Sequence, residues 1–329
     1  MISHAANPAG QRRHAMQMLV FCTLLWSLSF PAMKALALTQ QNLLPQSGSW
    51  FFTSLSVCYR FGIAGMLLLP FAWRQLRSLR KLEVEQGMLI AFFGGVGILF
   101  QMDGLAYTSA STSAFLTQGY CVFLPIWLAL VHRQWPSLKT FLCVVLVVFG
   151  VAVLAEISFH SFHLGRGEIE TLIASFLFTG QILNLGNPRY AANRPLCFTV
   201  VMLLGTALVS APLVCVTAPD AAACLRAYAS PAACGFLALI VVFCTLGAFM
   251  VMNVWQRHVT ATEAGLIYCS EPVFASLLAL FLPAIFSSWA NIHYANEILT
   301  LRLLVGGGLI TAANVLLQSP WLETRSANR

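Results

Sequence analysis

Long apolar stretches recur along the whole chain and are separated by short polar loops. Each stretch runs for roughly 17–25 residues, the length of helix that crosses about 30 Å of hydrocarbon. The stretches do not alternate polar and apolar residues as the strands of a membrane barrel do, so we expect helices. The predicted spans are 15–36, 50–73, 87–108, 110–131, 138–156, 168–186, 195–217, 232–255, 260–285 and 298–319.

Composition agrees with this pattern. The 329 residues are 59% hydrophobic and only 9% charged, whereas soluble domains carry about 25% charged residues. A chain this apolar cannot cover its surface with polar groups, so lipid is the expected solvent. The predicted fold class is therefore an all-α membrane protein with ten transmembrane helices.

Basic residues alternate between loops, and this alternation accounts for the formal net charge of +7. Such asymmetry follows the positive-inside rule and does not indicate a nucleic-acid partner. It predicts a multi-pass protein of a bacterial inner (plasma) membrane with both termini in the cytoplasm, which requires an even number of spans. The basic side carries Arg12, Arg13, Arg74, Arg77, Arg80, Lys81, Arg133, Lys139, Arg189, Arg194, Arg257, Arg325 and Arg329.

Ten spans divide into five plus five, and an odd number of spans inverts the second copy in the membrane. Faint internal similarity supports this division: the segment from Ser109 to Phe123 can be laid over the segment from Thr260 to Phe274. A polar stretch around 156–167 lies between the halves. The predicted organisation is a cytoplasmic tail, two five-helix repeats and a second cytoplasmic tail, at 1–14, 15–156, 157–319 and 320–329.

Several short motifs occur in a fixed order along the chain. They are Trp26-Ser27-Leu28-Ser29-Phe30, Tyr59-Arg60-Phe61, Gln101-Met102-Asp103-Gly104-Leu105, Trp255-Gln256-Arg257, Glu271-Pro272-Val273-Phe274 and Gly306-Gly307-Gly308. In this order they resemble the EamA-like ten-helix family of the drug/metabolite transporter superfamily, over roughly 15–319. The resemblance implies a secondary transporter with two inverted repeats around a central cavity, and it implies no particular substrate. Many relatives carry a Gly-Glu pair where this chain has Gln134 and Ile285, so any role of those glutamates is not carried over.

Two ionisable residues fall near the predicted midplane, where a charge costs a few kcal/mol or more. Arg60 is a candidate for binding a carboxylate or phosphate; the alternative is a structural arginine neutralised by helix carbonyls or an acidic neighbour. Glu271 precedes Pro272, at which the helix can bend. It is a candidate coupling group for protons; the alternative is a packing partner, for instance for Arg60. We expect Asp103 to be exposed at an outer vestibule and Lys34 to extend to the headgroups.

Uncharged polar and aromatic residues within the spans form a second set of candidates. Amides and phenols suit a cavity that hydrogen-bonds a polar solute and buries its apolar part, although interhelical hydrogen bonding explains each single residue equally well. The substrate-binding candidates of this set are Trp26, Gln101, Gln118, Tyr120, Gln181, Asn184, Asn253 and Tyr268. Gln256, Pro125 and Pro272 are candidates for gating.

The chain contains no P-loop, zinc-protease or hydrolase motif, so we expect no enzyme activity, metal or cofactor. Cys224 and Cys234 flank a predicted outer loop, where a disulfide is an open alternative. The leading hypothesis is a secondary transporter, and an exporter, that moves a small metabolite or amino-acid-like compound by alternating access. The alternative is a translocator of a lipid-linked headgroup or a membrane scaffold subunit. The expected partners are the lipid bilayer, the solute and protons as a candidate coupling ion, and the oligomeric state is open between monomer and homodimer.

Overall fold

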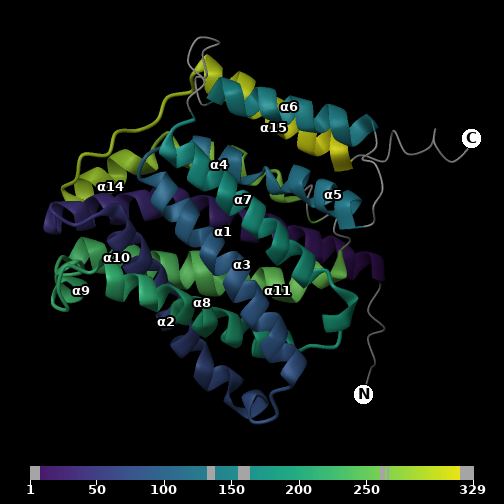
Figure 1. The fold of residues 1–329 in the computed structure, drawn as a ribbon, viewed down its shortest axis with the longest axis horizontal. Helices are drawn as coiled ribbons and strands as arrows, with labels where there is room; N and C mark the ends of the chain where they lie inside the picture. Colours follow the sequence, from purple (N-terminus) through teal and green to yellow (C-terminus); the bar gives the residue numbers. More distant parts are fainter. Residues whose placement is uncertain (1–7, 132–137, 155–163, 260–263, 265–266, 319–329) are drawn as a thin grey trace, which may run out of the picture.

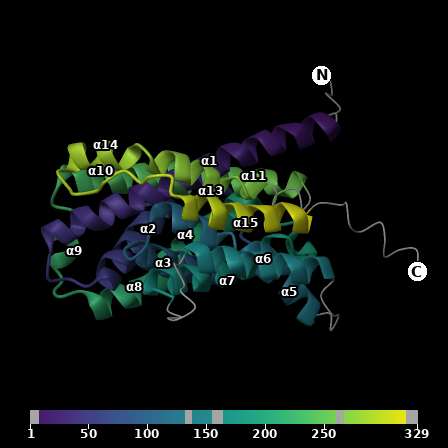
Figure 2. The same cartoon turned by 90° about the horizontal axis from the view of Figure 1, so that it is seen from above.

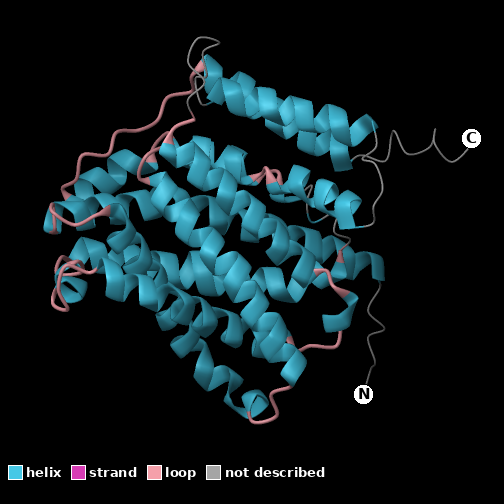
Figure 3. Cartoon of the chain, in the orientation of Figure 1, coloured by secondary structure: helices cyan, strands magenta, loops and turns pink. Residues whose placement is uncertain are grey.

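The computed structural model describes residues 8–131, 138–154, 164–259, 264 and 267–318, and within these ranges the regular structure is helical (Figure 3). The predicted tails, Gln134 and most of the polar stretch between the halves lie at least partly outside the described residues. The helices are α1 (Pro8–Leu43), α2 (Ser49–Leu76), α3 (Lys81–Leu105), α4 (Ala110–Thr117), α5 (Tyr120–Val131), α6 (Leu138–Leu154), α7 (Arg166–Leu185), η1 (Pro188–Tyr190), α8 (Pro195–Thr217), α9 (Ala223–Arg226), α10 (Pro231–Leu239), η2 (Ile240–Gly247), α11 (Ala248–Trp255), η3 (Gln256–His258), α13 (Glu271–Ala279), α14 (Leu282–Ala290) and α15 (Leu301–Gln318).

Five helices of the described part are each long and apolar enough to cross a membrane. They are Gln11–Leu43, Ser49–Leu76, Lys81–Leu105, Pro195–Thr217 and Pro231–His258, and the pair α13 and α14 forms a further candidate span bent by 52°. Large apolar side chains also face outward, among them Phe71 and Val216 at 79% and 82% exposure, as a lipid-facing surface requires. These features confirm the all-α membrane class. The count of ten spans stays a prediction, because several of the predicted segments are short or broken.

The helices form a bundle with α1 running through its middle (Figures 1 and 2). α3 packs along α7 and α8, and α2 packs along α8, so that helices from the two halves of the sequence alternate. α1 packs against α10, α11 and α13, while α6 and α15 pair with each other at one edge of the bundle. The first turn of α1 and the last turn of α15 lie at the same end of the bundle in both views.

Proline marks the start of several helices. Pro195, Pro231, Pro272 and Pro283 stand in the first turns of α8, α10, α13 and α14. A first-turn proline costs no hydrogen bond, because the first amides of a helix have no intrahelical acceptor. The sequence predicts a bend at Pro272, and the structure interrupts the helix directly before this residue: the chain turns at Cys269 and Ser270, and α13 begins at Glu271.

Glycine allows α3 and α7 to approach closely. A Cβ atom added at Gly104 would lie 2.8 Å from the carbonyl oxygen of Gly167, and one added at Gly94 would lie 2.5 Å from Oε1 of Gln181. The Gly167 oxygen belongs to the backbone, so a larger residue at Gly104 must push the helices apart, whereas the end of the Gln181 side chain can move away from position 94. Small residues at helix interfaces serve this purpose in membrane proteins.

A first prediction concerns this interface. Gly104→Ala is expected to destabilise the protein by about 1–3 kcal/mol, since a rigid backbone oxygen faces the new methyl group. Gly308→Ala is the matched control, because nothing lies within 4 Å of a Cβ atom at that position. Thermal unfolding in detergent compares the two variants. Equal midpoints for both would contradict close packing of α3 against α7.

Candidate functional site

A cavity lies in the middle of the bundle, between the broken ends of α4 and α13. It is narrow, with a volume of about 90 Å³. Its walls come from α1, α2, α3, α7 and α11 together with these two broken ends. The structure brings most of the predicted candidates to this one place: Trp26, Arg60, Gln101, Tyr120, Gln181, Gln256, Tyr268 and Glu271 line the cavity.

The two broken helices meet at a pair of polar side chains. Gln118 lies in the turn that separates α4 from α5, and Glu271 is the first residue of α13. Nε2 of Gln118 donates a hydrogen bond of 3.0 Å to Oε2 of Glu271, and Oγ of Ser27 donates to the Glu271 carbonyl at 2.9 Å. Glu271 thus occupies the positive end of the α13 dipole, where a carboxylate is stabilised. Gln118, a predicted substrate-binding residue, is here the direct partner of the predicted coupling group.

Arg60 is 4% exposed, and its hydrogen bonds lead to η2 and α1. Nε donates to Oγ1 of Thr245 at 2.6 Å, and a terminal nitrogen donates to the Cys244 carbonyl at 3.2 Å. The other terminal nitrogen contacts the sulfur of Met33 at 3.2 Å. The alternative that Arg60 and Glu271 pair with each other is therefore wrong for the described conformation. Thr245 is a site residue that sequence reasoning missed.

Aromatic rings close one side of the cavity. The ring of Trp26 lies 5.4 Å from that of Tyr268 and 5.8 Å from that of Phe249, measured between centroids. The Tyr268 hydroxyl donates to Oε1 of Gln256 at 3.0 Å. Opposite, Nε2 of Gln101 donates to Oγ1 of Thr117 at 2.9 Å, a residue that also lines the cavity. The cavity thus combines an apolar wall with a few oriented polar groups, as small-molecule sites do.

A second, wider cavity of about 440 Å³ adjoins the first. The two share Leu185, Met252 and Gln256 in their walls, so these three residues lie between the cavities and are called the neck below. Arg257 and Asn193 line the wide cavity. The wide cavity therefore lies at the end of the bundle that carries the basic loops.

Three predicted residues lie away from the central cavity. Asn253 lines the wide cavity, and its Nδ2 donates to Oγ1 of Thr199 at 2.8 Å. Asn184 is buried and lines neither of these two cavities, and its Oδ1 has no hydrogen-bond partner among the described residues. Pro125 falls within α5, but its side chain lies outside the described part of the structure.

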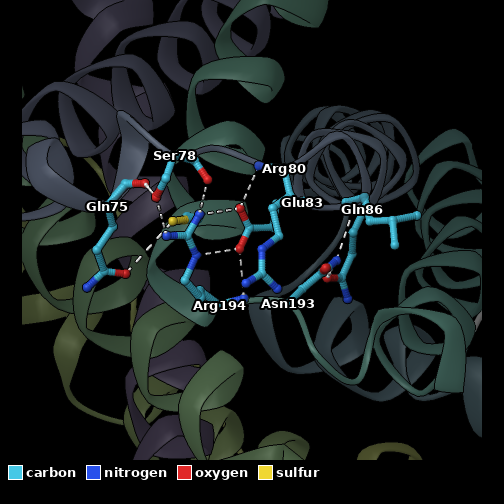
Figure 4. A network of polar contacts seen from close by, with 9 residues as sticks. Gln75, Ser78, Arg80, Glu83, Gln86, Asn193 and Arg194 are labelled. Atoms are coloured by element: carbon cyan, nitrogen blue, oxygen red, sulfur yellow. Dashed lines mark hydrogen bonds and ion pairs between the residues drawn. The ribbon is translucent and has the colours of Figure 1, made fainter.

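At the basic end, a clamp of polar contacts joins the start of α3 to the start of α8 (Figure 4). Nε and a terminal nitrogen of Arg194 bind the two carboxylate oxygens of Glu83 at 2.6 and 2.7 Å. Arg194 also donates to Oγ and to the carbonyl of Ser78. The Glu83 carboxylate raises the pKa of Arg194 above its usual range, because it hydrogen-bonds the charged form. A bidentate pair of this kind fixes geometry as well as charge.

A second prediction tests this clamp. Glu83→Gln is expected to destabilise the protein by about 1–3 kcal/mol, because the fully buried carboxylate also accepts the Arg80 and Arg194 amides. Glu85→Gln is the control: Glu85 binds Arg189 in an exposed pair, worth at most about 1 kcal/mol. Chemical unfolding in mixed micelles measures both. A larger loss for Glu85→Gln would contradict the clamp.

At the opposite end, charged contacts seal the bundle. Asp103 is fully buried and binds Arg166 at 2.5 Å, so the expectation that it is exposed in a vestibule is wrong. Arg166 also binds Glu170 at 2.8 Å and lies over the ring of Tyr107, 4.2 Å from its centroid. Burial next to a cationic partner explains how Asp103 is accommodated.

One further expectation, about Lys34, is corrected, and the open alternative of a disulfide is decided. Nζ of Lys34 donates to the carbonyl of Thr108, so that side chain does not extend to the headgroups. Cys224 and Cys234 are free thiols, and Sγ of Cys234 contacts the Tyr228 carbonyl, so no disulfide joins them here. The carboxylate of Glu297 accepts the amides of Ala110 and Ser111 at the start of α4, at 2.7 and 3.4 Å.

Comparison with known proteins agrees with this architecture. Residues 14–155 match the EamA-like transporter family. A protein of Archaeoglobus fulgidus described as an uncharacterized transporter is 26% identical over 262 residues, which cover 80% of this chain and 76% of that protein. The first half of this chain is therefore similar to EamA-like transporters. A solved protein crystal structure shares the fold of this chain, with a TM-score of 0.60 at 13% identity, covering 92% of this chain and 96% of the other.

The match to the EamA-like transporter family, together with the candidate spans, supports a multi-pass membrane protein. The match to 14–155 covers the same stretch as the first predicted repeat. The second repeat and its inversion stay predictions.

Proposed function

We propose that this protein is a secondary transporter that exports a small amphipathic metabolite or amino-acid-like compound by alternating access. The central cavity is the observation that carries the proposal: buried Arg60 and Glu271 and an aromatic wall surround one space between two broken helices. Transporters place their solute sites at such interruptions, because the freed helix ends supply polar groups at membrane depth. No enzyme activity is proposed.

Asymmetry between the two ends supports the export direction. Beyond the neck, the wide cavity lies at the end that carries Arg189, Arg194 and Arg257, which the positive-inside rule assigns to the cytoplasm. The other end is closed by Asp103 and Arg166. This conformation is therefore proposed to be the loading state, open to the cytoplasm. Export requires a second state in which the charged seal opens and the neck closes.

Proton coupling would supply the driving force. Glu271 is the carboxyl group that lines the central cavity among the described residues, and it lies at the junction of the broken helices. A proton bound there in one state and released in the other would link solute movement to a pH difference. We propose Glu271 for this role, and Gln118 as the residue that holds its side chain toward the cavity.

Reconstitution tests the proposed function. Purified protein in liposomes is expected to move at least one compound of a broad panel of amino acids, organic acids, amines and lipophilic cations faster than protein-free liposomes, with a rate that changes under an imposed pH gradient. Absence of protein-dependent flux across the whole panel would contradict the proposal. Protein-dependent movement of a fluorescent lipid between leaflets would instead favour a headgroup translocator.

A further inference from the structure

The guanidinium of Arg60 is a buried cation that lines the central cavity and whose hydrogen bonds go to uncharged groups. A guanidinium has five N–H donors in a planar fork. Of its acceptors here, the thioether of Met33 is weak, whereas Thr245 and the Cys244 carbonyl are strong. A buried cation held in this way retains donors for an anion and gains most from one in low dielectric.

Thr245 and the Cys244 carbonyl, the two strong acceptors of Arg60, both belong to a π-helical segment. η2 follows α10 without interruption and spans Ile240–Gly247. Oγ1 of Thr245 donates to the carbonyl of Ile240, five residues earlier, at 2.9 Å, and the same oxygen accepts from Nε of Arg60. The hydroxyl therefore joins the widened turn to the arginine. Single π-helical turns inside α-helices occur frequently at functional sites.

The charges around the cavity limit the ligand to a narrow class. Among the described residues that line it, Arg60 is the cation and Glu271 is the carboxyl group. One cation suits a monoanion, because a dianion would leave one charge unpaired in low dielectric. A carboxylate matches the planar fork of a guanidinium with two parallel hydrogen bonds. The rings of Trp26, Phe249 and Tyr268 offer a surface for an apolar body.

We propose that Arg60, oriented by Thr245 of the π-helical segment, binds the carboxylate of the transported compound while its apolar body lies against the aromatic wall. Thr245 is a positioning residue, since it acts through Arg60. The inference rests on the proposed function and specifies its substrate class, a monocarboxylate with an apolar or aromatic body. A zwitterion belongs to this class, because its ammonium group can approach Glu271.

A matched pair of probes tests the inference on the purified full-length protein. Calorimetry at neutral pH compares 3-phenylpropionate with 3-phenylpropanamide, which has the same shape and no charge. The wild-type protein is expected to bind the acid at least about 10-fold more tightly than the amide, the range for a hydrogen bond to a charged group. Phenylalanine is the zwitterionic probe and is expected to show the same dependence on Arg60.

The variants separate positioning from folding. Thr245→Val is expected to remove most of the preference for the acid and to leave amide binding unchanged. Thr245→Ser, which keeps the hydroxyl, is expected to retain the preference for the acid. Arg60→Gln is expected to abolish that preference. Thr39→Val is the control, because Thr39 is a buried threonine of α1 whose hydroxyl also bonds a helix carbonyl. Equal binding of acid and amide by the wild type, or a preference that survives Thr245→Val, would overturn the inference. Flux without this preference would leave the proposed function standing.

Discussion

In the Glu271→Gln variant, solute flux is expected to lose its dependence on a transmembrane pH difference while solute exchange at equal pH continues. Glutamine has nearly the shape of glutamate, and its amide oxygen can still accept the 3.0 Å hydrogen bond of Gln118. It cannot bind and release a proton at neutral pH. Binding and the rocking movement should therefore survive, while the link to the proton gradient is lost. Proteoliposome flux with and without a pH gradient measures this effect, and counterflow at equal pH measures exchange.

Other titratable groups could produce the same pH dependence, so a control is needed. Tyr268 lines the central cavity together with Glu271, and Cys22 is a buried thiol of α1, which packs against α13. Tyr268→Phe and Cys22→Ala are expected to retain the response to a pH gradient. Glu85→Gln, at an exposed ion pair that does not line the central cavity, serves as the general control. An unchanged pH response in Glu271→Gln would exclude Glu271 as the proton carrier.

Leu185→Trp is expected to reduce flux to the level of protein-free liposomes. Leu185 lies in the neck between the narrow and the wide cavity, together with Met252 and Gln256. An indole there would fill the passage through which solute must reach Arg60 and Glu271. Because Leu185 is only half-buried, the larger side chain can extend into the wide cavity without displacing its neighbours. The fold should therefore persist while transport stops.

The control for this variant is Leu208→Trp, because Leu208 on α8 is 67% exposed on the outer surface of the bundle. It adds the same side chain away from the passage, so its flux is expected to match the wild type. Flux and thermal unfolding are measured for both variants. Normal flux through Leu185→Trp would contradict the neck as the solute path.

Much of the fold follows from the sequence, because span length and apolar content are local properties. The starts of α8 and α10 follow from Pro195 and Pro231 in the same way. The helix breaks at Gln118 and Ser270, in contrast, depend on packing between the halves, and so does the π-helical segment. The sequence could not show which span lies beside which, and hence not that α3 packs on α7 and α8.

Depth in the membrane was sufficient to select Arg60 and Glu271, since a charge near the midplane is costly wherever the helix lies. It was not sufficient to assign their partners. Nothing in the sequence around Thr245 marks it as a site residue, because threonine is common in membrane helices. Its contact with Arg60 depends on how a different helix, α2, is placed beside it. Asp103 was misjudged for the same reason: its partner Arg166 comes from α7, 63 residues away. Asn184 lies only one turn from Gln181 on α7, yet it does not line the cavity.

The central claim is that one cavity, lined by Arg60 and Glu271, opens in turn to each side of the membrane. Ser29→Cys tests it most directly, because Ser29 is buried, lines that cavity and is isosteric with cysteine. The variant is prepared with the native cysteines replaced and with flux retained, and is treated with a membrane-impermeant maleimide in right-side-out and inside-out vesicles. Alternating access predicts that the thiol at position 29 reacts from the cytoplasmic side in the resting protein and from the outer side during transport. A thiol that reacts from one side only under all conditions, or from neither, would contradict the account.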